Sequence, residues 1–418
     1  MMGEPAARPS ETSTEETPER FGARAGDWLA EHLPEGIEFE PRTPQEELAH
    51  SRSFQAALYD AGFAGVTWPV EYGGRGLGQV HQQAFNDAVR DFSPPVGPFI
   101  VGLGMCGPTL ADLGTEAQKQ RYLRPLLRGE EIWCQLFSEP GAGSDVASLQ
   151  SRAVRDGDGW VLDGQKVWTT GAHVSDFGAI LVRTDPGVPK HQGLTMFVLD
   201  MRAPGVTVRP LRDMTGRSVF NEVFLDGVRL PADSVIGEVG QGWAAAVTML
   251  GHERVFIGGM ASRRSDALSF TALAGLAAER GTDRDPVVRE RLARLYAQQR
   301  ALSLFTRRMR QEADTGRPPG ARGSVAKLVG ALNDALAVEI SGDVTGPTAL
   351  AWDGVDTGAT DRALAVNGAP SSSIAGGTNE IQRNIIGERV LGLPKEPSVD
   401  RGVPFRELRV GTQKPGTE

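Results

Sequence analysis

The chain is poor in several features that mark particular classes of protein. Its 418 residues include only two cysteines, Cys106 and Cys134, which are too few for a disulfide framework and typical of a reducing compartment. No apolar run approaches the ~18 residues that a transmembrane helix needs. Positive charge is also scarce, since 44 Lys and Arg residues stand against 53 Asp and Glu residues and leave a formal net charge of −9. We therefore expect a cytoplasmic protein that binds neither a membrane nor a nucleic acid.

Residues 1–20 also lack the basic start and the apolar core of a signal peptide. They are rich in Glu, Ser, Thr and Pro, a composition that buries too little apolar surface to fold, so we expect a disordered tail. The rest of the chain is too long for a single hydrophobic core, and 40% of all residues are apolar. Two or three packed domains are the expectation.

Hydrophobic periodicity divides the chain after this tail into three regions, of which the first two differ sharply. Residues 21–130 have a helical spacing of apolar residues, and Thr115 with Gln118 matches a capping box at the start of a helix. Residues 131–241 change to short β-rich runs separated by turn pairs such as Asp226-Gly227. This pattern is typical of antiparallel strands joined by hairpins.

Residues 242–395 form the third region, in which the periodicity returns to long helices with one apolar stripe each. Val288 and Leu292 belong to one stripe, and Leu332 belongs to another. Such helices pack as a bundle. Residues 396–418 carry Pro, Gly and charges, and we expect them to form a loosely ordered tail. The predicted fold class is α+β, with an N-terminal helical domain, a middle antiparallel β domain and a C-terminal helical bundle.

Residues 135–145 read Gln-Leu-Phe-Ser-Glu-Pro-Gly-Ala-Gly-Ser-Asp and predict a strand that runs into a turn. Gly141 and Gly143 allow backbone conformations closed to other residues and a close approach to a ligand. Ser138 and Ser144 add hydroxyls beside backbone N–H groups, so the loop can hold a planar ring or a phosphate. Taken alone, it fits an ordinary surface turn better, because short glycine-rich patterns are common.

Three further motifs make this loop more informative. The four together are Ser-Glu-Pro-Gly-Ala-Gly-Ser-Asp (138–145), Lys-Val-Trp-Thr-Thr-Gly (166–171), Phe-Asn-Glu-Val-Phe-Leu-Asp-Gly-Val (220–228) and Gly-Gly-Thr-Asn-Glu-Ile-Gln-Arg (376–383). In this order they resemble the acyl-CoA dehydrogenase family of flavoproteins, and the resemblance extends from Phe21 to Pro394. It implies the same domain order, with a four-helix bundle at the C-terminal end.

The resemblance also implies an FAD site and an acyl-CoA substrate, with no metal. The residues at the family's FAD-contacting positions are Gln135, Leu136, Phe137, Ser138, Gly143, Ser144, Trp168, Thr169, Thr170, Arg280, Thr282, Thr378 and Glu380. The residues at its substrate-contacting positions are Ser144, His252, Arg254 and Gly377. Trp168 has an alternative interpretation as a core aromatic, which its residue type alone would favour.

The reaction that the resemblance implies removes the α-proton of an acyl thioester while the β-hydrogen leaves as a hydride to flavin N5. This α-proton is weakly acidic, so the protein must polarise the carbonyl and supply a desolvated base. Many family members carry the base as a glutamate directly before the Gly-Thr of the C-terminal motif. The residue at that position is Gly376, so the usual base is absent.

Glu253 is the predicted replacement. At helical spacing it shares a face with Met249, Leu250, Phe256 and Ile257, where a charge is costly unless it has a purpose or a partner. Burial there would make the carboxylate a stronger base. A minority branch of the family, including isovaleryl- and long-chain-type enzymes, carries its glutamate at the matching position.

An ion pair of Glu253 with Arg254 or His252 is the alternative, although adjacent residues on a helix do not face each other.

Gly376 keeps one role that the resemblance implies, the binding of the thioester carbonyl by its backbone N–H together with a ribityl hydroxyl of the flavin. The helix expected from Asn379 onward would support this role, because N–H groups at a helix start favour developing negative charge. A flexible loop before the helix is the alternative, and the Gly376-Gly377 pair would suit it equally.

The adenine side of the predicted flavin departs from the family pattern. Arg280 and Thr282 match an Arg-x-x-Phe-Gly element that reaches the FAD diphosphate across a subunit interface, but the Phe and the Gly are missing. Some bacterial members are α₂β₂ complexes of unequal chains, often acting on steroid side chains, and this arrangement would fit the departure. A homotetramer is the other expectation. An electron-transfer flavoprotein or a similar acceptor is implied as the redox partner.

Two other functions stay open on the sequence alone. A flavin-dependent monooxygenase of the same fold needs no such glutamate, and a non-catalytic subunit would only complete a partner's flavin site. A base on the apolar face of its helix favours dehydrogenation over both.

Overall fold

The computed structural model describes residues 16–34, 43–260, 266–315, 320–349, 357–398, 400 and 402–408. The chain divides into two compact units, residues 1–95 and residues 96–418, and each is described by itself. Residues 1–15 and 409–418, predicted to belong to the two tails, lie outside the described residues.

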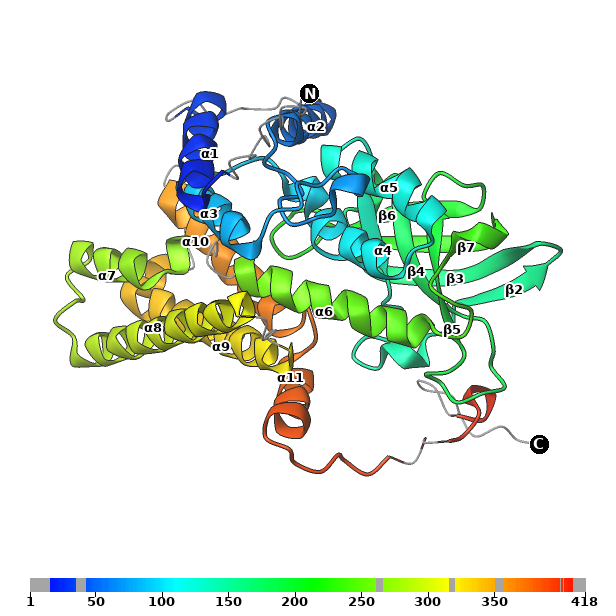
Figure 1. Ribbon diagram of the computed structural model, residues 1–418. Coiled ribbons are helices and arrows are strands. Elements are labelled where there is room, and N and C mark those ends of the chain that lie inside the picture. The colour runs from blue at the N-terminus through cyan, green and yellow to red at the C-terminus, as the bar shows by residue number, and fades with distance from the viewer. Residues whose placement is uncertain are drawn as a thin grey trace, which may run out of the picture. The chain divides into compact units, whose positions relative to one another are not determined.

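The first unit is helical, as the periodicity predicts (Figure 1). Its α-helices are α1 (Pro18–His32), α2 (Pro44–Asp60) and α3 (Gln79–Ala88). Thr17 and Thr43 cap the first two, because each side-chain oxygen accepts a backbone N–H of the first turn. Phe21, on the buried face of α1, meets Phe63 edge to face with ring centroids 5.5 Å apart.

The second unit begins with helices that lead into the sheet. A π-helical turn (Gly102–Cys106) precedes α4 (Gly107–Leu113) and α5 (Glu116–Arg128). The predicted capping box of α5 is confirmed, since Thr115 and Gln118 exchange both hydrogen bonds. The Gln118 amide also donates to the carbonyls of Asp233 and Val235, so the same cap ties α5 to the end of the β region.

Eight strands form one sheet in the order β6-β7-β3-β2-β4-β5-β8, with β1 paired to β4. The strands are β1 (Trp133–Leu136), β2 (Arg152–Asp156), β3 (Gly159–Thr170), β4 (Phe177–Arg183), β5 (Leu194–Asp200), β6 (Val206–Leu211), β7 (Phe220–Leu230) and β8 (Val235–Ile236). Most pairs are antiparallel, as expected, but β1 and β2 both pair with β4 in parallel. The 137–145 loop leaves β1 beside the inner strand β3, because the Val167 N–H of β3 donates to the Ser138 carbonyl.

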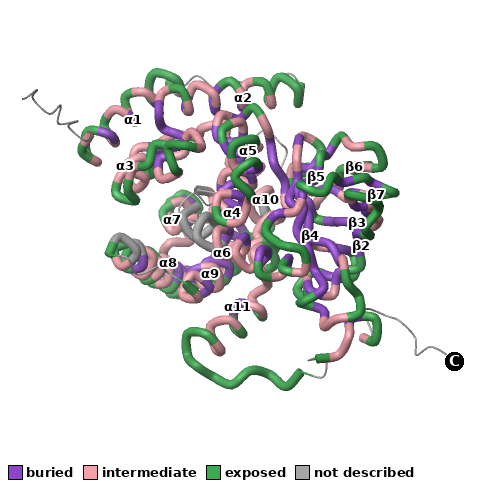
Figure 2. The backbone as a smooth tube through the Cα atoms, turned by 45° about the vertical axis from the view of Figure 1, so that its right-hand side comes forward, coloured by how far each residue is buried: buried purple, intermediate pink, exposed green. Residues whose placement is uncertain are grey.

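Side chains of these strands form the core of the β region, and β4, which Figure 2 shows largely buried, and β5 are buried at nearly every position. The members of this core include Leu162, Ile180 and Phe197. Cys134 belongs to this core, and Cys106 is also fully buried; both are unbridged, as expected from a chain with two cysteines. Burial raises the pKa of the Cys134 thiol to about 12, so this sulfur is an apolar packing group.

The C-terminal region returns to helices. They are α6 (Gly242–Met260), α7 (Phe270–Glu279), α8 (Pro286–Asp314), α9 (Gly323–Thr345), α10 (Thr357–Gly368) and α11 (Asn379–Ile385). The long helix α6 contacts both α9 and β5 and so joins the helices to the sheet (Figure 1). No helix in the described ranges is long and apolar enough to cross a membrane.

The apolar stripe predicted on α8 is confirmed, and the stripe predicted on α9 is confirmed only in part, since Ile340 is fully buried there. Val288 and Leu292 are buried on α8. Leu332, predicted to lie on the α9 stripe, is 43% exposed, and α9 buries small residues such as Ala326 and Ala331 in its place. Small side chains let neighbouring helices approach closely, which a search for large apolar residues overlooks.

Part of the C-terminal tail is ordered against the β region, which contradicts the expectation of a loose tail. Residues 402–408 include a 3₁₀ turn, Phe405–Glu407, and Phe405 is buried. In Figure 1 this segment, drawn in red, lies at the sheet end of the unit after a long extended connection.

Candidate active site

The 137–145 loop folds back on itself directly after β1. Glu139 and Ala142 exchange two backbone hydrogen bonds of 3.0 Å and so enclose the Pro140-Gly141 turn. A Cβ atom added at Gly141 or Gly143 would meet no atom within 4 Å, and neither glycine has a positive φ. The prediction that these glycines supply special backbone conformations is therefore wrong. Their contribution is open space beside the main chain, which suits the close approach of a ligand.

Two hydrogen bonds bring this loop to the 166–171 motif. The backbone N–H of Val167 donates to the Ser138 carbonyl at 2.9 Å, and the Lys166 ammonium donates to the Phe137 carbonyl at 3.1 Å. The two motifs, separated in sequence, thus form one rim, called the loop–β3 edge, although β3 itself is an inner strand of the sheet between β7 and β2. Ser144 lies exposed at the far end of the loop.

Trp168 is the most unusual residue of this edge. Its φ of 61° is the only positive value of a non-glycine residue in the described part of the chain, and it falls where the β3–β7 register shifts. Its side chain is 62% exposed and meets Phe220 edge to face. The core-aromatic interpretation is therefore wrong. A bulky residue in this conformation stores ~1–3 kcal/mol of strain, and such strain concentrates at functional sites.

Two buried polar atoms in this part of the sheet lack protein partners. One belongs to the residue after Trp168 on β3, and the other belongs to β1, the strand that leads into the loop. They are Oγ1 of Thr169 and Nε2 of Gln135, neither of which has a hydrogen bond within the described structure. Buried polar atoms are normally paired, and a ligand bound beside Trp168 would be one way to pair these two. An exposed indole, an open loop and unpaired buried donors and acceptors fit a planar heteroaromatic ring with polar edges, such as a flavin.

Leu136 and Phe137, also predicted to contact the flavin, have side chains buried in the protein. Only their main-chain atoms are available to a ligand. Thr170 is exposed at the end of β3, and Gly143 is exposed on the loop, so both can contact a bound molecule.

A buried ion pair between Glu139 and Lys166 fastens this edge, and sequence reasoning missed it. Lys166 is 0% exposed, and its ammonium donates to the Glu139 carboxylate at 2.8 Å and to the Leu181 carbonyl at 2.7 Å. Burial opposes ionisation of the Glu139 carboxyl group. The positive charge of the Lys166 ammonium and the hydrogen bonds that the carboxylate accepts nevertheless hold the pKa of Glu139 below its usual range. A lysine within a strand motif and a glutamate before a proline are the only signals in the sequence.

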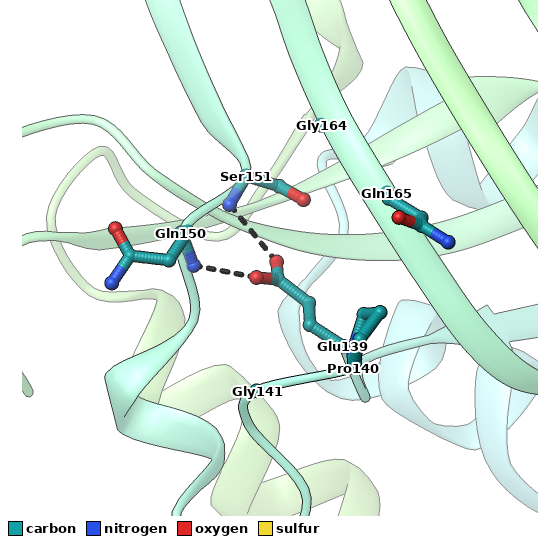
Figure 3. A pocket seen from close by; sticks show the side chains of 7 residues that line it. All are labelled: Glu139, Pro140, Gly141, Gln150, Ser151, Gly164 and Gln165. Atoms are coloured by element: carbon teal, nitrogen blue, oxygen red, sulfur yellow. Dashed lines mark hydrogen bonds between the residues drawn. The ribbon is translucent and has the colours of Figure 1, made fainter. Parts of the chain in front are cut away.

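Figure 3 shows the Glu139 carboxylate accepting the backbone N–H groups of Gln150 and Ser151, at 2.6 and 3.0 Å. A cavity of about 250 Å³ lies here, lined by Glu139, Pro140, Gly141, Gln150, Ser151, Gly164 and Gln165. Gly141, predicted to let a ligand approach, lines it, but none of the residues predicted to contact FAD or substrate does. The cavity lies beside the Glu139 carboxylate, which supports the loop. It is not where the sequence predicts the flavin.

Glu253 lies on α6 with its side chain only 7% exposed. Met249 and Ala246, one and two turns earlier on the same face, are fully buried. Leu250, also predicted on this face, is half-buried, so the prediction for the half of the face before Glu253 is confirmed for Met249 and only in part for Leu250. The side chains of Phe256 and Ile257 lie outside the described residues.

His252 and Arg254 are the neighbours of Glu253 that are predicted to contact substrate, and only the side chain of His252 is described. The His252 ring Nε2 lies 2.8 Å from the Asp112 carboxylate of α4, so this histidine joins α6 to α4. The side chain of Arg254 lies outside the described residues.

Gly376 and Gly377 form a built turn before α11, with φ values of 67° and 89°. The Gln382 amide, almost fully buried, donates to both carbonyls, at 2.8 and 3.2 Å. Thr378 caps α11 by accepting the Ile381 N–H. These bonds define one conformation of the turn, which argues against the flexible-loop alternative. Gln382 is a second site-forming residue that sequence reasoning missed.

The remaining predicted residues make local contacts. Arg280 follows α7 and donates to the Thr348 hydroxyl at 3.2 Å, and Thr282 bonds back to Ala277. Glu380 is exposed in the first turn of α11 and pairs with Arg383. Among the described residues, no hydrogen bond links Arg280 or Thr282 to the 137–145 loop.

Comparison with known proteins agrees on the identity of all three regions. Family models match residues 15–130 as the acyl-CoA dehydrogenase N-terminal domain, residues 134–228 as the middle domain and residues 240–391 as the C-terminal domain. Acyl-CoA dehydrogenase IpdE1 of Mycobacterium tuberculosis is 37% identical, over 90% of this chain and 98% of the relative.

Two further matches come from a longer relative and from a solved structure. Acyl-CoA dehydrogenase FadE34 of the same organism is 40% identical over 82% of this chain, which spans 46% of that longer relative. The solved structure of the Tcur3481-Tcur3483 steroid ACAD superposes with a TM-score of 0.76 at 29% identity, covering 91% of this chain and 98% of the other.

Proposed function

The chain belongs to the acyl-CoA dehydrogenase family of FAD-dependent enzymes, and we propose that Glu253 is the base that removes the α-proton of its acyl-CoA substrate. The observation that carries this proposal is the burial of the Glu253 side chain on the apolar face of α6. A carboxylate in such a place is costly, and desolvation strengthens it as a base near neutral pH.

The turn at Gly376 supports the same assignment. It holds a glycine where many family members hold the catalytic glutamate, and its positive φ disfavours any residue with a Cβ. The turn is fixed by Gln382, so its backbone can serve a second purpose. We propose that the Gly376 N–H donates to the thioester carbonyl, which would stabilise the negative charge that develops as the α-proton leaves.

The edge formed by the 137–145 loop and β3 is the proposed flavin site. FAD, when bound, supplies the acceptor for the hydride that leaves the β-carbon. Trp168 would cover the ring, while Thr169 Oγ1 and Gln135 Nε2 would gain partners for their buried polar atoms. Ser144, exposed on the same loop, is the proposed contact to ligand.

The names of the relatives support a proposal for the substrate class and the assembly. The matched solved structure is named a steroid ACAD and carries two protein names, so we propose a bulky, steroid-like acyl group and a complex with a second, unequal chain. The incomplete match around Arg280 supports such a partner, because a second chain could complete the adenine side. The named relatives are dehydrogenases, which favours this reaction over the monooxygenase of the same fold. An electron-transfer flavoprotein is the proposed acceptor.

The assignment is tested by turnover with an acceptor dye on a panel of straight, branched and steroid-like acyl-CoA esters, with the protein alone and with candidate partner chains. Glu253→Gln should lower turnover on the best substrate by ~10²–10⁴ while the protein keeps its flavin, because Gln retains the shape and loses the proton-accepting oxygen. Near-wild-type turnover in this variant would show that another residue is the base.

A further inference from the structure

The C-terminal segment packs against the loop that joins β4 to β5. The backbone N–H groups of Phe405 and Arg406 donate to the carbonyls of Val188 and Pro186, at 2.9 and 3.0 Å, and Pro404 forms a β-bridge with Pro189. These bonds attach the segment to a loop and leave the strands, which pair with each other along their full length, unaffected. The segment therefore adds to the sheet without being needed for its hydrogen bonds.

Arg183, at the end of β4, contacts both the C-terminal segment and the segment that follows Ser144. The Phe405 ring covers its guanidinium, with Cζ 3.4 Å from the ring centroid. The guanidinium is almost fully buried and donates to the carbonyls of Ala147, Leu149 and Lys190, at 2.6, 3.4 and 3.1 Å. One cation thus holds three carbonyls of two loops, and Phe405 closes it off from water.

Lys190 makes a second connection, directly to the residue after Ser144. Its ammonium lies 2.8 Å from the Asp145 carboxylate and 2.5 Å from the Asp400 carboxylate. Asp145 also accepts the Ser148 hydroxyl at 2.5 Å, which fixes the turn after the loop. One buried lysine therefore ties the ligand loop to a residue more than two hundred positions later in the chain.

We propose that Asp400 and residues 402–408 form a C-terminal clasp that fixes the 141–151 loop through Lys190 and Arg183, which makes Lys190 and Phe405 positioning residues for Ser144. The functional part of this inference rests on the proposed role of the loop in binding flavin and acyl-CoA. The positional part rests only on the bonds described above.

Substitution is the way to open the clasp, because pH would not do so under assay conditions. The hydrogen bond from Lys190 lowers the pKa of Asp400 to about 2, so the pair stays ionised near neutrality. Lys190→Met removes the ammonium and keeps most of the side chain, and Asp400→Asn weakens the same link from its other end. Matched controls are Lys395→Met, an exposed lysine, and Asp156→Asn, which breaks the exposed pair with Arg229.

The first readout is amide hydrogen exchange of the purified full-length protein, which does not depend on activity. Lys190→Met and Asp400→Asn should raise exchange within residues 141–151 about three- to tenfold and leave β5 unchanged, as expected for the loss of a partly exposed charged hydrogen bond. The control variants should leave both segments unchanged. Unchanged exchange at 141–151 in both clasp variants would overturn the proposal, and if Lys190→Met fails to fold, Asp400→Asn alone decides.

The second readout separates this inference from the proposed function. The clasp variants should raise KM for the best acyl-CoA ester about three- to tenfold with little change in kcat, and Lys190→Arg should restore most of the loss. A fall in kcat without a change in KM, or no change in either, would contradict the positioning role. A wild-type protein without dehydrogenase activity in every partner combination would overturn the proposed function, while the exchange result would still decide whether the clasp exists.

Discussion

The loop–β3 edge and the turn before α11 reach a defined geometry by different means. The loop–β3 edge, residues 135–145 with 166–170, is fastened by a buried ion pair and carries a strained, exposed Trp168. The turn at Gly376 is fastened by one neutral amide, and its strain is relieved by glycine. On the proposed assignments, cofactor binding and proton chemistry depend on separate supports, and substitutions should affect them separately.

The largest effect on stability should come from breaking the buried pair of the loop–β3 edge. Lys166→Met leaves the Glu139 carboxylate buried without its cation and should destabilise the protein by ~3–5 kcal/mol, with loss of flavin. Arg229→Met, which breaks the exposed pair with Asp156, is the control and should cost less than ~1 kcal/mol. Urea unfolding of both variants measures the difference. Equal losses would show that the Glu139–Lys166 pair does not fasten this edge.

Trp168 should show opposite effects on stability and on cofactor binding. Trp168→Gly relieves the left-handed backbone, so the protein without flavin should be unchanged or more stable, by up to ~1 kcal/mol. Flavin affinity should nevertheless fall about tenfold, which corresponds to ~1.4 kcal/mol, because the aromatic cover is lost. Trp168→Phe should keep most of that affinity. Thermal melts and flavin titration test this, and a variant that loses stability without losing affinity would make Trp168 a structural residue.

The turn at Gly376 should show a modest loss of stability that can be separated from its effect on turnover. Gly376→Ala places a Cβ at a φ of 67° and should cost ~1–2 kcal/mol locally, with a lower kcat and normal flavin content. Gly227→Ala is a matched control, since its φ is 61° and its Cβ would meet no atom within 4 Å. It should cost similar stability and leave kcat unchanged. Equal kcat in the two variants would remove Gly376 from the chemistry.

The sequence could predict those parts of the site that depend on local spacing or on motif order. The burial of Glu253 follows from the positions of Met249 and Ala246 one and two turns away on the same helix. The association of the loop with β3 follows from motifs that occur together in one family, and the bond from Val167 to Ser138 is its structural basis. The capping box of α5 is equally local, because four consecutive residues determine it.

The sequence could not predict features that depend on distant partners. Lys166 meets Glu139 across 27 positions, and a lysine in a strand is ordinarily expected on the solvent face. The exposure of Trp168 depends on a register shift, which composition does not reveal. On α9 the buried face begins with small residues such as Ala326 and Ala331, so the position of Leu332 in a stripe of leucines was misleading. The C-terminal clasp joins residues from opposite ends of the second unit and has no local signature.

The most direct test of the central claim measures proton removal without hydride transfer. An acyl-CoA ester with a quaternary β-carbon, which carries three carbon substituents besides the α-carbon, can lose an α-proton but has no β-hydrogen to give. Incubated with the flavin-loaded enzyme in D₂O and followed by mass spectrometry, this ester should gain deuterium at the α-carbon with the wild-type protein. Glu253→Gln, with equal flavin content and equal affinity for the ester, should slow that exchange by ~10²–10⁴. Exchange at the wild-type rate in Glu253→Gln would contradict the account, because the base would then lie elsewhere.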